Sequence, residues 1–142
     1  MPIVICLPLK PRSLNARPSV AYKEAISNAA RERHTGALFD VPLYSRIIWF
    51  HKYVTTQGDV DNVAKRIHDA LKDVLFSDDR VITHTMTVRV DVSAGVEIAS
   101  DPENPDAAIE LSEQLALTST RDVLYIEIGI QVDTQTRLGP LS

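Results

Sequence analysis

The most constraining feature of the sequence is a strict alternation of apolar and polar residues over residues 81–92. One side of this segment carries Ile82, His84, Met86, Val88, Val90 and Val92, and the other carries three threonines, Arg89 and Asp91. Alternation with a period of two is typical of a β-strand that has one buried face and one solvated face. The pattern therefore predicts a long, half-solvated strand.

Further strands and helices are predicted on both sides of this segment. Strand-like runs occupy residues 3–7, 43–53 and 123–132, and a short returning strand is expected at 96–100. Helical spacing occupies a segment that begins after Ser19 and stops near Gly36, and also residues 62–76 and 105–117. The expected fold class is α/β (α+β), a small mixed β-sheet with helices packed against it.

The length and composition are those of one soluble globular domain. A chain of 142 residues with 44% hydrophobic and 24% charged residues can bury a single core, so one domain is expected over residues 1–142, with a flexible tail at 133–142. No apolar run approaches the ~18 residues of a membrane span, and the N-terminus does not resemble a signal peptide. We expect a cytoplasmic protein without a membrane partner, in which Cys6 is a buried, inert thiol.

The net charge of −4 conceals an uneven distribution along the chain. Residues 1–72 carry 11 Lys and Arg against 6 Asp and Glu, whereas residues 73–142 carry 4 against 13. The segment 91–113 has seven acidic residues and no Lys or Arg. A polyanion such as DNA could therefore meet the first half of the chain and would be repelled by the acidic segment.

The segment 10–18 combines prolines with three cations, Lys10, Arg12 and Arg17. Proline fixes the backbone, so the segment is predicted to be an extended, stiff loop. It can be a plain connector or a basic loop that binds a polyanion, and the sequence alone does not choose between them.

Residues 58–79 gather more charge than a fold requires. Asp59 and Asp61 lie two residues apart, Lys65 follows one helical turn later, and Asp78 and Asp79 come just after the predicted helix. Side chains two residues apart on an extended backbone point the same way. Asp59 and Asp61 can therefore be directed at one site.

Each member of this group also has a structural interpretation. Spacing alone favours Asp61 as the N-cap of the predicted helix, and Lys65 is an equally good ion-pair partner for Asp61 or Asp69. The helix dipole disfavours negative charge beyond the C-terminal end, so Asp78 and Asp79 need another explanation.

Convergence of Asp59, Asp61 and Asp79 would create a metal site. It requires the strand after Asp79 to run alongside the strand before Asp59. Clustered carboxylates repel one another unless a cation lies between them, and hard oxygen ligands favour Mg²⁺ or Mn²⁺. Such a site suits metal-assisted phosphodiester hydrolysis, in which Lys65 would neutralise charge on the scissile phosphate.

Other motifs fail on spacing. A calcium loop that starts at Asp59 would need different residues at Val63, Ala64 and Ala70. The four histidines are not clustered and there is no second cysteine, which argues against zinc. The chain is also too short for the usual nucleotide-binding domain of a sugar-nucleotide transferase.

The pattern as a whole resembles the RusA-type Holliday junction resolvases. The segment 7–15 is similar to the family's proline-rich N-terminal loop, and 22–25 to its first helix. The family's D-x-D-N-x-x-K, D-A-L and D-D signatures are matched at 59–65, 69–71 and 78–79. These spaced elements cover most of the chain and are specific in combination.

This resemblance implies a homodimeric α/β nuclease that resolves four-way DNA junctions with Mg²⁺ or Mn²⁺ in DNA recombination and repair. Asp59, Asp61 and Asp79 would then be the metal-site carboxylates and Lys65 the catalytic lysine. The expected DNA contacts are Lys10, Arg12, Arg17 and Lys65. Two sites related by a two-fold axis would suit symmetric cuts in two strands.

The acidic stretch is similar to an insertion in this family pattern, with an acidic helix around 101–118. It supports an alternative hypothesis of a different class: a protein of RusA fold that binds a protein partner, as an inhibitor or immunity factor would, through the segment 91–113. Cleavage of a synthetic four-way junction separates the two hypotheses.

Overall fold

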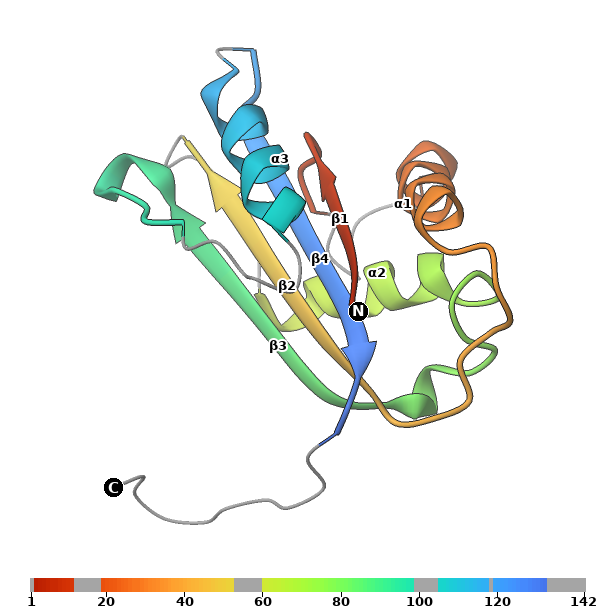
Figure 1. Cartoon of the computed structure of the whole chain (residues 1–142). Coiled ribbons are helices and arrows are strands. Elements are labelled where there is room, and N and C mark those ends of the chain that lie inside the picture. The colour runs from red at the N-terminus through yellow and green to blue at the C-terminus, as the bar shows by residue number, and fades with distance from the viewer. Residues whose placement is uncertain (1, 12–18, 53–59, 99–104, 118, 133–142) are drawn as a thin grey trace, which may run out of the picture.

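Four strands form one open mixed sheet in the order β1-β4-β2-β3, and three helices pack on it (Figure 1). The strands are β1 (Ile3–Leu7), β2 (Leu43–His51), β3 (Ile82–Asp91) and β4 (Asp122–Ile130), and the helices are α1 (Val20–Arg33), α2 (Val60–Leu71) and α3 (Pro105–Ala116). The structure is a computed structural model that describes residues 2–11, 19–52, 60–98, 105–117 and 119–132, and only the backbone of 60–62. The predicted small mixed sheet with helices packed against it is confirmed.

The strands β2 and β3 are parallel neighbours joined through helix α2, while β4 is antiparallel to both β1 and β2. Ser45 of β2 pairs with Thr85 of β3, and Trp49 pairs with Arg89. The strand after Asp79 therefore does run alongside the strand that precedes Asp59. As an edge strand, β3 has a neighbour on one side only within the described part of the chain.

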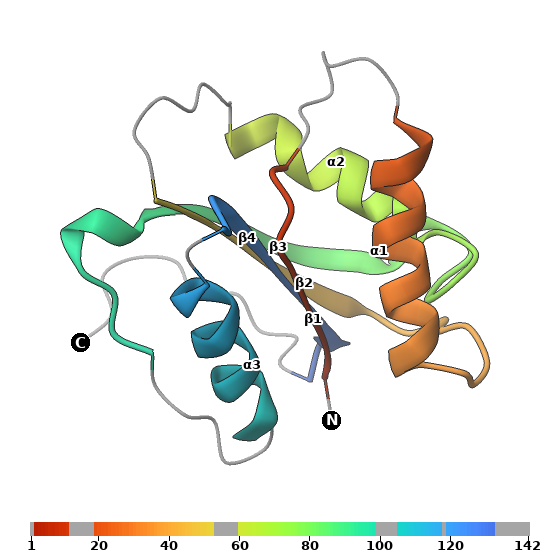
Figure 2. The same cartoon turned by 90° about the horizontal axis from the view of Figure 1, so that it is seen from above.

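The two faces of the sheet are covered by different helices (Figure 2). Helices α1 and α2 pack on one face, around fully buried residues such as Ile26, Ile67 and Ile126. Helix α3 packs on the other face through Ala107 and Leu111, against Val4, Cys6 and Val123. The sheet is thus the middle of three layers. No helix in the described part of the chain is long and apolar enough to cross a membrane.

Helix α1 begins where the sequence predicts. The Ser19 side chain accepts a hydrogen bond from Tyr22 N at 3.2 Å, which satisfies one of the free N–H groups of the first turn. The helix ends at Arg33, close to the predicted stop near Gly36, but Gly36 is not the residue just beyond the cap, because His34 is the C-cap and takes an extended conformation. His34 stacks on Phe39 at 4.7 Å between ring centroids, so tertiary packing ends the helix before the glycine.

Helix α2 departs from prediction at both ends. It begins at Val60, which places Asp61 inside the first turn, so the prediction of Asp61 as the N-cap is wrong. It ends at Leu71 and not at Phe76, because Val74, Leu75 and Phe76 are all buried and three successive residues cannot share one helical face. Asp73 has a φ of 65° in the turn that follows.

The returning strand predicted at 96–100 is absent from residues 96–98, which lie outside any strand, while 99 and 100 fall outside the described residues. The helix predicted at 105–117, within the acidic stretch around 101–118, exists as α3 and is one residue shorter than predicted. Its neighbouring residues 101–104 and the predicted flexible tail 133–142 are also outside the described residues.

Candidate active site

Lys65 and Asp79 meet beside the exposed side of helix α2. The Lys65 ammonium lies 3.1 Å from Asp79 Oδ2 and 3.0 Å from Asp69 Oδ1. Lys65 is carried by α2, and Asp79 begins the short 3₁₀ turn Asp79–Val81 that leads into β3. The two ends of the β2-α2-β3 connection thus bring together two residues that are 14 positions apart in the sequence.

Both partners are held in their charged forms. The hydrogen bonds that Lys65 donates to the carboxylates of Asp69 and Asp79 raise the pKa of Lys65, and the bond to Asp79 lowers the pKa of that carboxyl group. The side chains are 51% and 40% exposed, respectively, so this ion pair contributes little to stability. An exposed, charged pair that does little for folding remains accessible to a ligand.

Asp78 has a structural role in this turn. Its side chain accepts a hydrogen bond from Arg80 N at 3.0 Å and thereby caps the 3₁₀ turn. Asp79 is consequently positioned by its neighbour, while its own carboxylate is directed at Lys65. Asp78 therefore has a role in folding. Asp79 belongs to a charged cluster that it forms with Lys65 and Asp69.

A buried polar pair that the sequence analysis did not identify lies under this cluster. His68 Nε2 is 2.8 Å from Ser45 Oγ, and the two residues are 8% and 2% exposed. Burial lowers the pKa of His68 against the opposing effect of Asp79, so the ring stays neutral near pH 7. The signal in the sequence was Ser45 at an inward position between Leu43 and Ile47 of β2.

The other predicted site residues are placed only in part. Asp61 is described by its backbone alone and Asp59 not at all, so their convergence with Asp79 stays a prediction. Among the described residues no group of three or more His, Cys, Asp or Glu side chains is placed to hold a metal ion. Lys10 is exposed after β1, whereas Arg12 and Arg17 lie outside the described residues.

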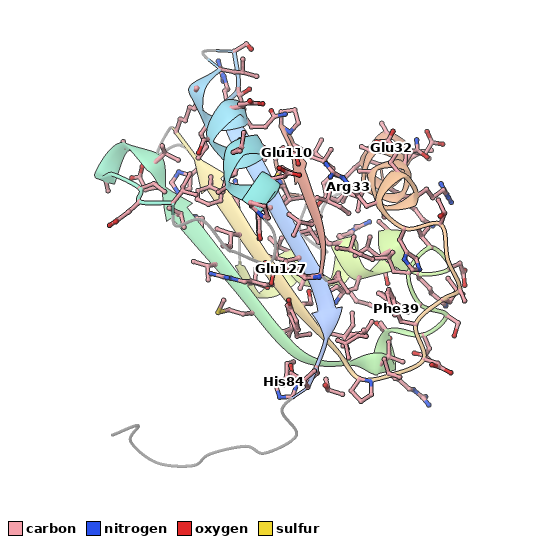
Figure 3. All side chains as sticks on the ribbon, in the orientation of Figure 1. Glu32, Arg33, Phe39, His84, Glu110 and Glu127 are labelled. Atoms are coloured by element: carbon pink, nitrogen blue, oxygen red, sulfur yellow. The ribbon has the colours of Figure 1, made fainter. Side chains whose placement is uncertain are left out.

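The acidic helix is on the opposite side of the sheet from Lys65 and Asp79, as Figure 2 shows for α3 and α2. Arg33 of α1 bonds Glu110 of α3 at 2.9 Å, and Figure 3 shows these two side chains directed at one another. Helix α3 is therefore separated from the candidate site by the thickness of the sheet.

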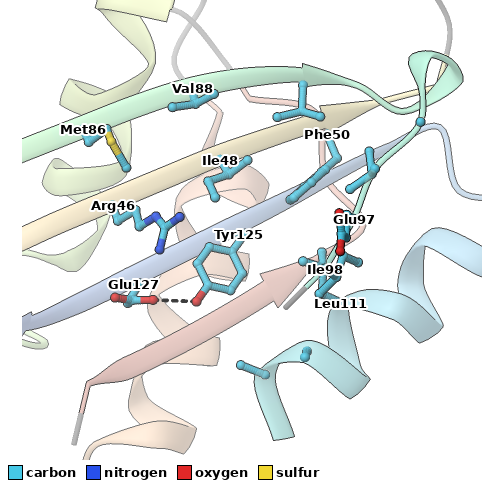
Figure 4. Close-up of a pocket in the computed structure, with 15 residues that line it drawn as sticks. Arg46, Ile48, Phe50, Met86, Val88, Glu97, Ile98, Leu111, Tyr125 and Glu127 are labelled. Atoms are coloured by element: carbon cyan, nitrogen blue, oxygen red, sulfur yellow. Dashed lines mark hydrogen bonds between the residues drawn. The ribbon is translucent and has the colours of Figure 1, made fainter. Parts of the chain in front are cut away.

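A trough of about 660 Å³ lies beside α3 on that opposite face (Figure 4). Its floor is mainly apolar, with Met86 and Val88 of β3 47% and 37% exposed. At one end, Glu127 accepts hydrogen bonds from Tyr125 at 2.6 Å and Tyr44 at 2.7 Å. This carboxylate is satisfied within the fold, and the trough does not reach Lys65 or Asp79.

Comparison with known proteins supports the nuclease interpretation of the chain. A family model described as Endodeoxyribonuclease RusA matches residues 11–99, which is more than half of the chain. The match includes Asp59, Asp61, Lys65 and Asp79 and ends before helix α3. A search of curated proteins gave no match.

Proposed function

The chain belongs to the RusA family of endodeoxyribonucleases, and from this premise we propose that it resolves four-way DNA junctions by metal-dependent phosphodiester hydrolysis during recombination and repair. The observation that carries the proposal is the contact between Lys65 and Asp79 within the matched segment. This contact brings Lys65 of the D-x-D-N-x-x-K signature next to Asp79 of the D-D signature at an exposed position.

Lys65 has the properties of a group that stabilises negative charge at a scissile phosphate. Its pKa is raised, so it stays protonated at physiological pH, and its side chain is half exposed. A fixed cation beside a phosphate lowers the free energy of the transition state as negative charge shifts between its oxygens. We assign Lys65 this role, with Asp69 and Asp79 holding the ammonium in place.

The donor set of the site fits a hard divalent cation. Asp79 is an ionised carboxylate near pH 7, and Lys65 lowers its pKa further; carboxylate oxygens are the ligands that Mg²⁺ and Mn²⁺ prefer. We propose that Asp59, Asp61 and Asp79 would hold Mg²⁺ or Mn²⁺. Such an ion, when bound, would lower the pKa of a water molecule and neutralise charge on the phosphate.

Paired cuts call for two sites, so we propose that the chain acts as a homodimer. A two-fold dimer presents two copies of the same charged cluster, which matches the two-fold relation between opposing strands of a four-way junction. Lys10, Arg12 and Arg17 are proposed as additional phosphate contacts, because most non-specific affinity for DNA comes from neutralised phosphates.

The test is cleavage of a synthetic four-way junction by the purified chain with Mg²⁺, compared with Asp61→Asn, Lys65→Met and a matched control, Asp40→Asn. We expect paired symmetric cuts by the wild type and the control, and a loss of roughly a hundredfold or more in rate for the two site variants. Asp40 is exposed and lies outside the charged cluster.

An intact junction with the wild type under these conditions would overturn the proposal and leave the protein-binding hypothesis standing. Equal rates for Asp61→Asn and Asp40→Asn would refute the assigned site even if the junction is cut. Binding of Mn²⁺ to each variant, followed by calorimetry, gives a readout that does not depend on cleavage.

A further inference from the structure

We propose that the polar face of edge strand β3, formed by Thr85, Thr87 and Arg89, is a contact surface for the DNA phosphate backbone that extends from the candidate active site. The inference rests on the proposed function and adds residues to it. None of these three belongs to the charged signatures or to the basic N-terminal loop, so they form a separate part of the DNA-binding surface.

The alternation of β3 directs its two sets of side chains to different layers. His84, Met86 and Val88 belong to the face that carries α3 and the trough. Thr85 pairs with Ser45, and Arg89 pairs with Trp49, whose own pair in β4 is Leu124 of the core beneath α1 and α2. The polar set therefore lies on the face that carries α2, Lys65 and Asp79.

We call Thr85, Thr87 and Arg89 the β3 strip. The position of α2 places this strip next to the candidate site. His68 bonds Ser45, and Ser45 is the partner of Thr85, so Thr85 is level with the last turn of the helix. Because β2 and β3 are parallel and α2 returns between them, Arg89 lies towards the end where α2 begins. A DNA strand along β3 would pass from beside Lys65 towards the D-x-D segment.

Arg89 is fixed in a way that suits phosphate binding. Its guanidinium carbon lies 5.6 Å from the centre of the Trp49 ring, which is 1% exposed and anchored by a 2.9 Å hydrogen bond from Trp49 Nε1 to Asp122 Oδ1. Stacking restrains the guanidinium while Arg89 remains exposed. A restrained guanidinium loses less conformational entropy on binding a phosphate.

The two threonines add neutral donors next to this cation. Thr85 is exposed and Thr87 half-buried, and neither hydroxyl has a hydrogen-bond partner within the described residues. Hydroxyl groups commonly donate to phosphate oxygens and carry no sequence information. Alternate residues on one face are ~6.7 Å apart, so the three side chains extend over ~13 Å.

The acids near this strip lie at its Arg89 end. Asp91, two residues beyond Arg89, accepts hydrogen bonds from Ser93 N at 2.9 Å and Ser93 Oγ at 2.6 Å and stays ionised, so a phosphate would compete with this carboxylate for Arg89. Asp122 accepts from Trp49. The acidic residues of α3 lie beyond the opposite face of the sheet, so they are not placed to repel a DNA strand at β3.

The test compares Arg89→Ala with Arg46→Ala in binding a four-way junction in the presence of EDTA over a range of salt concentrations. Arg46 is the matched control because it is an exposed arginine on the adjacent strand β2 and faces the trough. We expect Arg89→Ala to weaken binding about tenfold and to reduce the slope of log K against log salt by about one. Arg46→Ala should leave both quantities unchanged.

Two further variants separate this role from a folding role. Arg89→Lys keeps the charge without the planar guanidinium and should bind with intermediate affinity. Thr85→Val with Thr87→Val should weaken binding while the salt slope stays the same, since no charge is removed. Thermal unfolding of each variant, monitored by circular dichroism, should match the wild type.

These experiments distinguish failure of the inference about β3 from failure of the proposed nuclease function. If the wild type binds and cuts the junction but Arg89→Ala and Arg46→Ala bind alike, the β3 strip is refuted and the nuclease assignment stands. Loss that differs between two junctions of unrelated sequence would also overturn it, because phosphate contacts weaken binding equally on both. If the wild type does not bind junctions at all, both proposals fall together.

Discussion

Burial of the His68 side chain makes the free energy of unfolding depend on pH. Burial lowers its pKa below 6.5, whereas an unfolded chain takes up a proton near that value, so the unfolded state binds more protons as the pH falls. The free energy of unfolding should therefore fall below about pH 6.5, by at most about 1.4 kcal/mol per pH unit from this group. Urea unfolding at about pH 7.5 and about pH 5.5 measures the loss.

Replacing His68 by Gln should flatten this dependence. The variant keeps a group able to reach Ser45 but has no proton to gain. His84→Gln is the control, since His84 is exposed on β3 and its removal should leave the wild-type slope. Equal slopes for the wild type and His68→Gln would show that burial of this ring does not govern acid sensitivity.

Gly129 of β4 leaves room for the ring of Tyr44, its partner on the neighbouring strand β2. A Cβ at Gly129 would lie 2.5 Å from the Tyr44 ring, closer than real contacts allow. Gly129→Ala must displace the ring and weaken its hydrogen bond to Glu127, at a cost of about 1–3 kcal/mol in the free energy of unfolding.

A double-mutant cycle checks this cause. In a Tyr44→Ala background the clash is gone, so Gly129→Ala should then cost much less. Equal costs in the two backgrounds would mean that the glycine is needed for its backbone and not for its neighbour. Chemical denaturation of the four proteins supplies the numbers.

Among the helices, α1 depends on a defined start. Ser19→Ala removes the acceptor for Tyr22 N and should lower the free energy of unfolding by about 1 kcal/mol. Ser112→Ala, at an exposed interior position of α3, is the control and should be neutral or slightly stabilising. If the Ser19→Ala protein is as stable as the control, the Ser19 cap does not stabilise this helix.

Which face of a helix is buried proved harder to predict than its existence. In α1 the apolar Val20 is 72% exposed, whereas the polar Ser27 is buried and donates a hydrogen bond to Ala70 O at 2.7 Å. Ser27 is buried because α1 packs on α2 as well as on β1. Contacts between helices distant in sequence leave no periodic trace in either one.

At the scale of the whole molecule, the sheet separates the acidic helix α3 from Lys65. Helix α3 lies over one face of the sheet, and helix α2, which carries Lys65, lies over the other. Charges further apart than the Debye length of ~8 Å at physiological salt interact weakly. Asp106→Asn with Glu113→Gln should therefore change junction affinity by less than about twofold, although it removes two negative charges.

A matched variant tests this separation. Asp69→Asn removes one negative charge directly beside Lys65 and should tighten binding more than the double change on α3. Titration of labelled junction at fixed salt compares the three proteins. A larger effect from the α3 variant would show that the acidic helix does reach the DNA.

The sequence by itself determined the order of the strands and helices except for the returning strand expected at 96–100, and also the N-cap of α1 and the charged signatures, because these depend on neighbours a few residues apart. It left Lys65 between a catalytic and an ion-pairing role. Only the tertiary structure showed that Lys65 bonds Asp79 as well as Asp69, because that contact needs the turn after α2 to close. Only the tertiary structure also showed which face of the sheet α3 covers. A period of two in the sequence distinguishes the two faces of a strand but does not indicate which helix packs on each face.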